Sequence, residues 1–174
     1  MGQTVGDVVV SAGSQWHAPF CPHYPPWKQV IMSTESNKTV VRRYYDEVLN
    51  AGNLALIDEL AVDAYIENDP FPGQGNGRAD LKARVAALFE AFSPCLFRIE
   101  DVVAEGDRVV VRWSSSGTHS GSFMGMPPTN RSYTISGIDI HRLTDGRMAE
   151  HWHVVDQLSQ LQQLGVLPSQ APAS

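Results

Sequence analysis

The sequence predicts a single α+β domain in which a curved antiparallel sheet wraps around a pocket that N-terminal helices cover. Three observations favour this fold. Helical periodicity occupies residues 36–92, strand-like segments joined by tight turns occupy 96–155, and the 174 residues suffice for one ordinary domain but not comfortably for two. Helices followed by consecutive hairpins are typical of an α+β fold, whereas a parallel sheet would alternate strands with helices.

Residues 1–33 differ from the rest of the chain in composition. Residues 18–27 include four prolines and show no hydrophobic period, and proline is unfavourable in helix interiors and central strands. We therefore expect a proline-rich arm or disordered extension over residues 1–33, the folded domain over 34–168, and a tail over 169–174.

Three helices are predicted before the sheet. In the first helix, apolar side chains recur along one face: Val40, Val41, Tyr44, Tyr45, Val48 and Leu49. Residues 50–53 end this helix, and a short second helix follows over 54–60. A brief extended segment at 65–67 and a glycine-rich loop precede the third helix, over residues 79–92, which Pro94 terminates.

The second half of the chain is predicted to form the sheet. We expect strands over residues 96–104, 108–116, 131–143 and 147–155, with hairpin turns at 105–107 and 145–146 and a long loop at 121–130. Asp156 can cap a last helix that runs to Leu164 and stops at Gly165. A long antiparallel sheet can curl, and helices on its concave side then leave a natural pocket.

Composition limits the partners and the location. The net charge is −6, from 13 basic and 19 acidic residues, which argues against a nucleic-acid partner because that would need a basic face. Cys21 and Cys95 are far apart in the sequence and fit no zinc-binding spacing. No apolar run approaches the ~20 residues that span a membrane. We expect a cytoplasmic protein with a small-molecule substrate and no membrane partner.

Asp139 is the residue that most strongly suggests chemistry. It lies in a predicted strand between Ile138 and Ile140, although aspartate is disfavoured inside strands. A solvated face or an arginine partner would explain it, and the alternative is a carboxyl group in an apolar cavity. In a cavity, desolvation would raise its pKa from about 4 toward neutrality, so that it could take and return a proton. Asp139 is therefore our candidate general acid/base.

Histidines on the last two strands are candidate pocket residues beside this aspartate. Alternation places His141 on the same face as the candidate acid/base. On the next strand His151 and His153 share one face and Glu150 and Trp152 share the other, and the spacing leaves open which pair faces the pocket. Because no third convergent ligand is identifiable, we predict no metal site.

Residues outside these strands complete the candidate site. His119 follows the strand at 108–116, at the expected rim of the pocket, and is a second candidate catalytic residue. Asn68 could direct its amide into the mouth of the pocket, and Phe71 lies nearby in the sequence. Tyr44 and Tyr45 supply one inward hydroxyl group; the pattern does not say which, and we include Tyr44 in the predicted pocket.

Several motifs together resemble the SnoaL-like polyketide cyclase (ester cyclase) family. They occupy residues 43–45, 50–53, 104–109, 117–121, 126–129, 137–142, 145–152 and 162–165. The resemblance covers residues 38–168. It implies the nuclear-transport-factor-2-like (NTF2-like) cone fold, usually as a homodimer or a higher oligomer such as a homotetramer, and no cofactor. Asp139 matches the aspartate of the family's Gly-x-Asp strand, which implies a general acid/base for intramolecular aldol closure of a polyketide ester.

The sequence departs from the family's habit at a few positions. Glu67 and Asn68 stand where a histidine often precedes the proline, and His141 and His153 stand where an aromatic and an acidic residue are more frequent. These changes enrich the pocket in imidazole and leave proton transfer intact.

The resemblance implies a cofactor-independent enzyme of lyase or isomerase type that acts on a small, largely apolar carbonyl or polyketide-like substrate. An epoxide hydrolase or isomerase on the same fold is an alternative. A hydrolase would need a second carboxylate and an arginine around a water, and Glu150 could be that carboxylate if its face points inward. A further alternative is that the chain is not an enzyme but a binding or accessory protein that only holds a small molecule.

Overall fold

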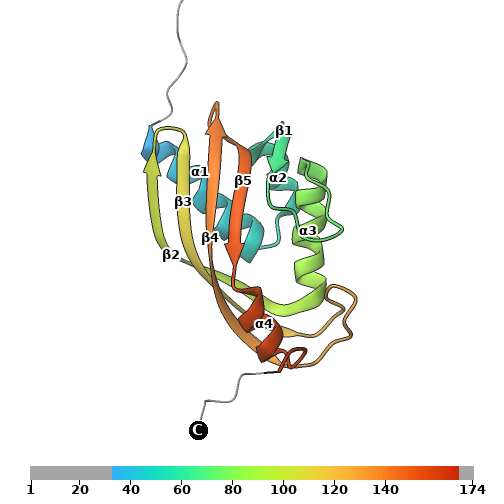
Figure 1. Cartoon of the computed structure of the whole chain (residues 1–174). Helices are drawn as coiled ribbons and strands as arrows, with labels where there is room; N and C mark the ends of the chain where they lie inside the picture. Colours follow the sequence, from blue (N-terminus) through green and yellow to red (C-terminus); the bar gives the residue numbers. More distant parts are fainter. Residues whose placement is uncertain (1–32, 169–174) are drawn as a thin grey trace, which may run out of the picture.

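The computed structural model describes residues 33–168, which form the predicted α+β domain (Figure 1). The tail expected at 169–174 and, apart from Ser33, the arm expected at 1–33 lie outside the described residues. The elements are, in order, α1 (Thr34–Arg43), the π-helical η1 (Tyr44–Asn50), the 3-10 turn η2 (Leu54–Leu56), α2 (Ile57–Leu60), β1 (Ala61–Glu67), α3 (Arg78–Ala91), β2 (Phe92–Glu105), β3 (Arg108–His119), β4 (Ser132–Thr144), β5 (Arg147–Val155) and α4 (Gln157–Gln163).

Five strands form one curved sheet in the order β1-β5-β4-β3-β2. Strands β2 to β5 pair antiparallel in chain order, as the sequence predicts. Strand β1 pairs parallel with β5, and Glu67 lies opposite His151. Only a short extended segment was expected here, because the two partners stand 84 positions apart and no local pattern reveals their pairing.

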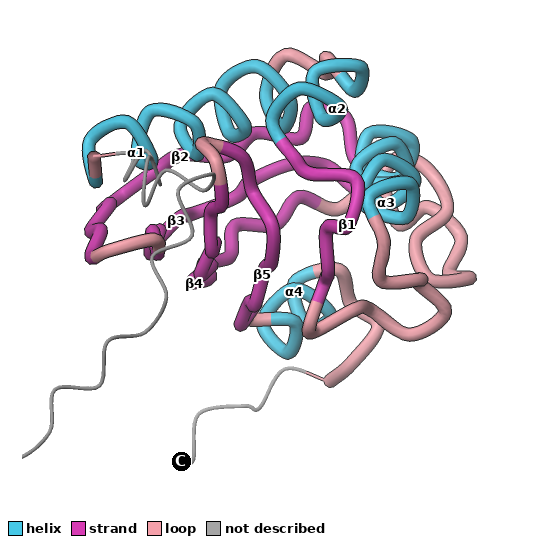
Figure 2. The backbone as a smooth tube through the Cα atoms, turned by 90° about the horizontal axis from the view of Figure 1, so that it is seen from above, coloured by secondary structure: helices cyan, strands magenta, loops and turns pink. Residues whose placement is uncertain are grey.

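The helices α1, α2 and α3 cover one side of the curved sheet (Figure 2). Helix α1 runs on into η1, and this joint helix places its apolar face against the strands. Both Tyr44 and Tyr45 are buried in it, as are Val48 and Leu49 one turn later. Within residues 33–168, no helix combines the length and the apolar character that crossing a membrane requires.

Side-chain alternation decides which strand residues face the helices. On β4, Asp139 and His141 are buried, whereas the neighbouring Ile138 is 47% exposed. On β5, His151 is buried and Val154 is 74% exposed. The question that the sequence left open is therefore answered: the histidine set of β5 faces the helical layer.

The hairpin of β2 and β3 is longer than the sequence predicts, at the start of β2 and at the end of β3. Phe92 pairs with His119, so β2 begins at Phe92 rather than at residue 96, and β3 extends to His119. Helix α3 consequently ends at Ala91, ahead of Phe92. Cross-strand pairing over the whole length of the hairpin extends both strands beyond their locally strand-like sequence.

Gly137 on β4 makes room for the indole ring of Trp113 on β3. The two residues are direct partners in the ladder, and a Cβ atom at position 137 would lie 2.2 Å from Cζ2 of Trp113. That is far below van der Waals contact, so any side chain there would displace the indole, which lines a cavity between the sheet and the helices.

Candidate active site

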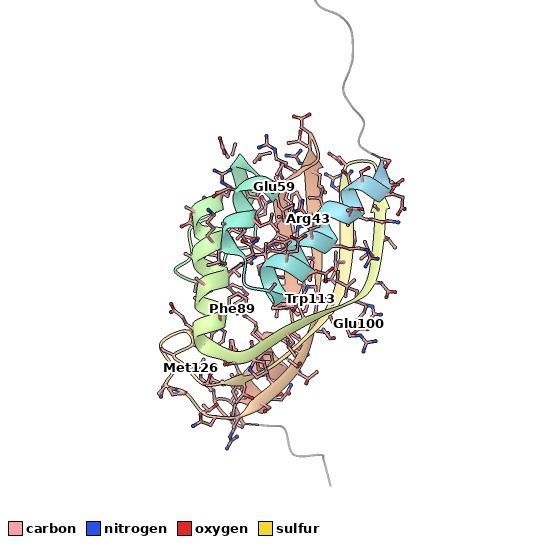
Figure 3. All side chains as sticks on the ribbon, turned by 180° about the vertical axis from the view of Figure 1, so that it is seen from behind. Arg43, Glu59, Phe89, Glu100, Trp113 and Met126 are labelled. Carbon is pink, nitrogen blue, oxygen red and sulfur yellow. The ribbon has the colours of Figure 1, made fainter. Side chains whose placement is uncertain are left out.

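A cavity of about 340 Å³ lies between the buried face of the sheet and the helical layer. Figure 3 views the molecule from this helical side, with α1 and α3 in front of the strands. Most of the wall is aromatic or aliphatic and includes Leu88, Phe97, Trp113, Tyr133 and Ile135. The charged and imidazole side chains in the wall are Asp80, Arg84, Asp139, His151 and His153. An apolar pocket with a few convergent polar groups is the usual form of a small-molecule site.

Asp139 presents its carboxyl group to this cavity while remaining 7% exposed. The hydroxyl group of Tyr45 donates a hydrogen bond to Oδ2. Nε2 of His151 lies 3.5 Å from the same oxygen. One side chain from η1 and one from β5 therefore hold the carboxyl group of a β4 residue.

The pKa of Asp139 moves in the opposite direction from the one that we expected. Burial alone would raise it, but the charge of His151, 3.5 Å away, and smaller contributions that include the hydrogen bond from Tyr45 outweigh burial and lower the pKa of Asp139. The expectation of a pKa near neutrality is therefore wrong. Asp139 is a carboxylate at neutral pH, and its first role in any proton transfer is that of a base.

His151 lies between two carboxylates. Its Nε2 faces Asp139, and its Nδ1 lies 2.8 Å from Oε2 of Glu67, whose side chain is completely buried. Burial lowers the pKa of His151, but Asp139 and Glu67 outweigh burial and raise it. The pKa of Glu67 is lowered, because the hydrogen bond with His151 and the nearby ring of His153 outweigh its burial. The imidazole of His151 and the two carboxylates thus form a buried row, in which both carboxylates favour the protonated imidazole.

Arg84 adds a second positive charge to this row. It extends from α3, and its Nη1 lies 3.3 Å from Oε2 of Glu67. The hydroxyl group of Tyr65 donates a 3.4 Å hydrogen bond to the same oxygen. Among the described residues, Nε of Arg84 is buried without a hydrogen-bond partner. Because Arg84 also lines the cavity, its guanidinium group is available to a ligand.

His141 lies behind His151 and does not line the cavity. The two imidazole rings stack with centroids 4.7 Å apart and an interplanar angle of 22°. Burial and the charge of His151 lower the pKa of His141 to about 3. Neither ring nitrogen of His141 has a hydrogen-bond partner among residues 33–168. His141 is therefore a neutral packing group at neutral pH.

Two groups of three side chains bring potential metal ligands within 4.8 Å of one another. They are Glu67, His151 and His153, and Asp139, His141 and His151. No third ligand was identifiable beside the histidines from the sequence, and the structure supplies one in each group. However, His151 belongs to both groups and faces a carboxylate with each ring nitrogen, and the guanidinium group of Arg84 already neutralises Glu67. Side chains of both groups therefore take part in one buried ion-pair network.

Five of the predicted site residues line the cavity together: Tyr44, Phe71, Asp139, His151 and His153. Tyr44 and Tyr45 both point inward, but Tyr45 is the one that contacts Asp139. Phe71 packs against the ring of His153 with centroids 5.0 Å apart.

Besides His141, three of the predicted pocket residues do not line the cavity. Glu150 points to the other side of the sheet, where its carboxylate accepts a 2.9 Å hydrogen bond from Nε of Arg142. Trp152 shares that side by strand alternation. Asn68 donates its amide to the backbone carbonyl of His151 at 3.3 Å and does not line the cavity. Glu150 is therefore not the second carboxylate of a hydrolase site.

His119 does not share the site with Asp139. Val111 of β3 pairs with Asp139, and His119 lies eight positions further along the strand, about 26 Å away at 3.3 Å per residue. Nδ1 of His119 lies 3.1 Å from Oγ1 of Thr129, and its ring packs against Phe92. The geometry gives His119 a packing role at the far end of the hairpin and no contact with the candidate acid/base.

Three residues of the site were missing from the sequence prediction. Tyr45 was left undecided, while Glu67 and Arg84 were not considered as site residues. A usable signal existed for Arg84: it stands three positions after Leu81 and four before Leu88, so a cation lies on the apolar face of α3. Glu67 had no comparable signal, because only the parallel pairing with β5 brings it inside.

The fold and the site define a class of cone-shaped α+β domains that hold a small molecule between a curved sheet and its helices. Comparison with known proteins then gives the family. The family model described as SnoaL-like polyketide cyclase matches residues 39–164, so the chain belongs to this family. Membership confirms the resemblance seen in the sequence and places the chain among enzymes of lyase or isomerase type.

Individual relatives agree with this assignment. The aklanonic acid methyl ester cyclase DauD from Streptomyces sp. (strain C5) is 29% identical over 133 residues, which are 72% of this chain and 80% of DauD. The structure of TsrD from Streptomyces laurentii matches with a TM-score of 0.72 at 26% identity, over 78% of this chain and 99% of TsrD. IdmH from Streptomyces antibioticus, a proposed polyketide cyclase, matches with a TM-score of 0.65 at 28% identity, over 74% of this chain and 98% of IdmH.

Proposed function

We propose that this chain is a cofactor-independent cyclase or isomerase that uses Asp139 as general acid/base on a small, largely apolar carbonyl or polyketide-like substrate. One observation supports this most directly. The carboxyl group of Asp139 reaches a mainly aromatic and aliphatic cavity. It accepts a hydrogen bond from Tyr45 and lies 3.5 Å from Nε2 of His151. A fixed base in an apolar cavity suits proton abstraction from carbon.

The reaction that fits these groups is an intramolecular aldol closure. The carboxylate of Asp139 takes a proton from a carbon beside a carbonyl group; the C–H bond breaks and its electron pair moves to the carbonyl oxygen as an enolate. The enolate carbon forms a bond to a second carbonyl carbon of the same molecule. The protonated Asp139 then returns its proton to the resulting alkoxide. No atom is gained or lost, and the protein contributes proton transfer and proximity.

Positive charge lies where the reaction develops negative charge. The guanidinium group of Arg84 and the imidazolium group of His151 both reach the cavity beside Asp139. Preorganised charges of this kind stabilise an enolate or alkoxide oxygen more than they would in water. The apolar wall, with Phe97 and Trp113, suits the hydrocarbon part of the substrate. The name of DauD supports a methyl ester as a first probe.

The geometry gives less support to an epoxide hydrolase. Glu150, the candidate for the second carboxylate of this reaction, points to the other side of the sheet. Glu67 and Arg84 bring a carboxylate and an arginine inside the domain, but Glu67 does not line the cavity. The other carboxylate in the wall is Asp80, which accepts a 2.9 Å hydrogen bond from the backbone N–H of Gly77.

Deuterium exchange tests the proposal even for a probe that does not cyclise. The protein would be incubated in D2O with aklanonic acid methyl ester and with smaller 1,3-dicarbonyl esters, and exchange and ring closure would be followed by NMR and mass spectrometry. We expect Asp139→Asn to slow both by about 100- to 10,000-fold, the usual contribution of a general acid/base. Glu150→Gln is the matched control, and it should leave the rates unchanged because Glu150 lies outside the cavity.

Equal rates for the wild type and Asp139→Asn would show that Asp139 is not the acid/base. Binding of the probes by calorimetry without exchange or closure would favour the non-catalytic alternative. Opening of styrene oxide, with no activity on the carbonyl probes, would favour the epoxide hydrolase.

A further inference from the structure

The proposed proton transfer changes the surroundings of His151, because it removes the negative charge of Asp139. Asp139 is stabilised as a carboxylate partly by the imidazolium group of His151, 3.5 Å away. When Asp139 accepts a proton, that imidazolium group loses a counter-ion inside the domain, since the side chain of His151 is 3% exposed. An uncompensated buried charge is strongly destabilising. A base held only by such a pair would be weak.

Glu67 supplies a second counter-ion on the opposite edge of the same ring. Its Oε2 lies 2.8 Å and its Oε1 3.0 Å from Nδ1 of His151. The Glu67 side chain is completely buried and does not line the cavity, so it is not placed to take a proton from a substrate. The imidazolium group therefore stays paired with Glu67 in both protonation states of Asp139.

We propose that Glu67 is a positioning residue, which keeps His151 as an imidazolium with Nε2–H directed at Asp139 before and after Asp139 takes the substrate proton. The catalytic consequence rests on the proposed function, whereas the protonation state of His151 does not. With Glu67 in place, protonating Asp139 removes one of the two carboxylates that face His151, and the imidazolium group stays paired with Glu67.

Arg84 makes this arrangement electrically balanced. Glu67 and Asp139 carry two negative charges, and His151 and Arg84 carry two positive charges, with Nη1 of Arg84 3.3 Å from Oε2 of Glu67. Burying one imidazolium with two carboxylates alone would leave a net negative charge, which would favour a proton on a carboxylate. The Arg84 cation removes that excess and keeps both carboxylates ionised.

The other titratable groups around His151 come from four elements, β1, η1, β4 and β5, and do not replace Glu67. On β4, His141 stacks on the ring and stays neutral. On β5, Nδ1 of His153 lies 3.5 Å from Oε1 of Glu67, so it competes for that carboxylate rather than pairing with His151. The remaining groups are phenols, which stay protonated because burial raises their pKa values: Tyr44, Tyr45 and Tyr65. Glu67 and Asp139 are thus the two anions that face His151 within the described residues.

Nuclear magnetic resonance of the histidine rings tests this directly in the full chain. The protein would be labelled with 15N-histidine, and the His151 signals assigned by their loss in His151→Asn. In the wild type we expect both ring nitrogens to carry protons at pH 6.5 and the apparent pKa to lie above that ordinary value. In Glu67→Gln we expect it to fall by about one to three pH units, the usual effect of removing an adjacent opposite charge.

Two further variants separate positioning from folding. Glu150→Gln removes a carboxylate from the outer side of β5 and should leave the His151 titration unchanged. Glu67→Asp keeps the negative charge and should restore at least part of the shift. If Glu67→Gln does not fold, the wild type alone decides: a His151 that is mainly neutral at pH 6.5 overturns the proposal. An unchanged His151 titration in a folded Glu67→Gln also overturns it.

The deuterium-exchange rates keep this inference distinct from the proposed function. Glu67→Gln should shift the pH dependence of exchange, because Asp139 and His151 then compete for one proton. A shifted His151 titration without exchange in the wild type would support the role of Glu67 in protonation and contradict the catalytic proposal. Normal exchange in the wild type, together with an unshifted His151 titration in Glu67→Gln, would support the catalytic proposal and contradict the positioning role of Glu67.

Discussion

The hydroxyl group of Tyr45 donates a hydrogen bond to Oδ2 of Asp139, although the two residues are 94 positions apart in the chain. Tyr45 belongs to η1 and Asp139 to β4, so this bond ties the helical layer to the sheet at the cavity. Both groups are buried. The bond therefore serves stability and also holds the carboxylate in one orientation toward the cavity.

Replacing Tyr45 by phenylalanine should destabilise the domain and weaken proton transfer. The ring still fills its place, but a buried carboxylate loses a donor, which costs about 1.5–3 kcal/mol. Urea denaturation at pH 7 measures the loss. Tyr44→Phe is the matched control in the same helix, because the Tyr44 hydroxyl makes no hydrogen bond within the described residues. Equal destabilisation by both variants would contradict a special role for the Tyr45 hydroxyl.

His141→Phe should make the domain more tolerant of acid. Burial, followed by the charge of His151, lowers the pKa of His141 to about 3 in the folded chain, from an ordinary value of 6.5. The unfolded chain therefore binds more protons between these two values, and this residue costs stability as the pH falls through that window. Its two ring nitrogens have no partners to lose among residues 33–168.

The measurement for His141→Phe is the free energy of unfolding at several pH values between 6.5 and 5. Relative to the wild type, the variant should gain up to about 1.4 kcal/mol for each pH unit of acidification. Comparison with the wild type cancels the contribution of His151, whose raised pKa acts with the opposite sign. Parallel stability curves for the two proteins would contradict a neutral, desolvated His141.

Gly137→Ala should disturb the cavity wall. The new Cβ atom would lie 2.2 Å from Cζ2 of Trp113, so the indole must move or the strands must separate. Overpacking of this kind typically costs about 1–3 kcal/mol. Thermal denaturation measures the cost, and the fluorescence of the tryptophans reports the displacement. Ser136→Ala, next to it on the exposed side of β4, should change neither.

Self-association should involve the outer side of the sheet. This side exposes large apolar side chains that include Leu96, Val103, Ile138 and Val154, and exposed apolar patches often mark protein–protein contacts. We expect a homodimer or homotetramer in sedimentation-velocity experiments. A double substitution of Ile138 and Val154 by lysine should dissociate it without unfolding the chain. A wild type that stays monomeric at high concentration would contradict this prediction.

The sequence by itself determined the fold class and the position of the acid/base candidate. Alternation in β4 and the periodicity of the first helix are local patterns, set by whether a residue faces the core. They were sufficient to place Asp139 on a strand and the two tyrosines on the apolar face of a helix, but the expectation that only one hydroxyl group points inward was wrong, because both tyrosines are buried. The motif around Asp139 then pointed to the family that comparison confirms.

Only the tertiary structure decided what surrounds Asp139. Glu67 reaches His151 through a parallel pairing of strands 84 positions apart, and Arg84 arrives from a separate helix. Distance along β3 removes His119 from the site, although its motif lies close to the active strand in the sequence. The direction of the Asp139 pKa depends on these long-range charges outweighing burial. Local sequence records neither distances nor charges contributed by other elements, and electrostatics at a buried site depends on both.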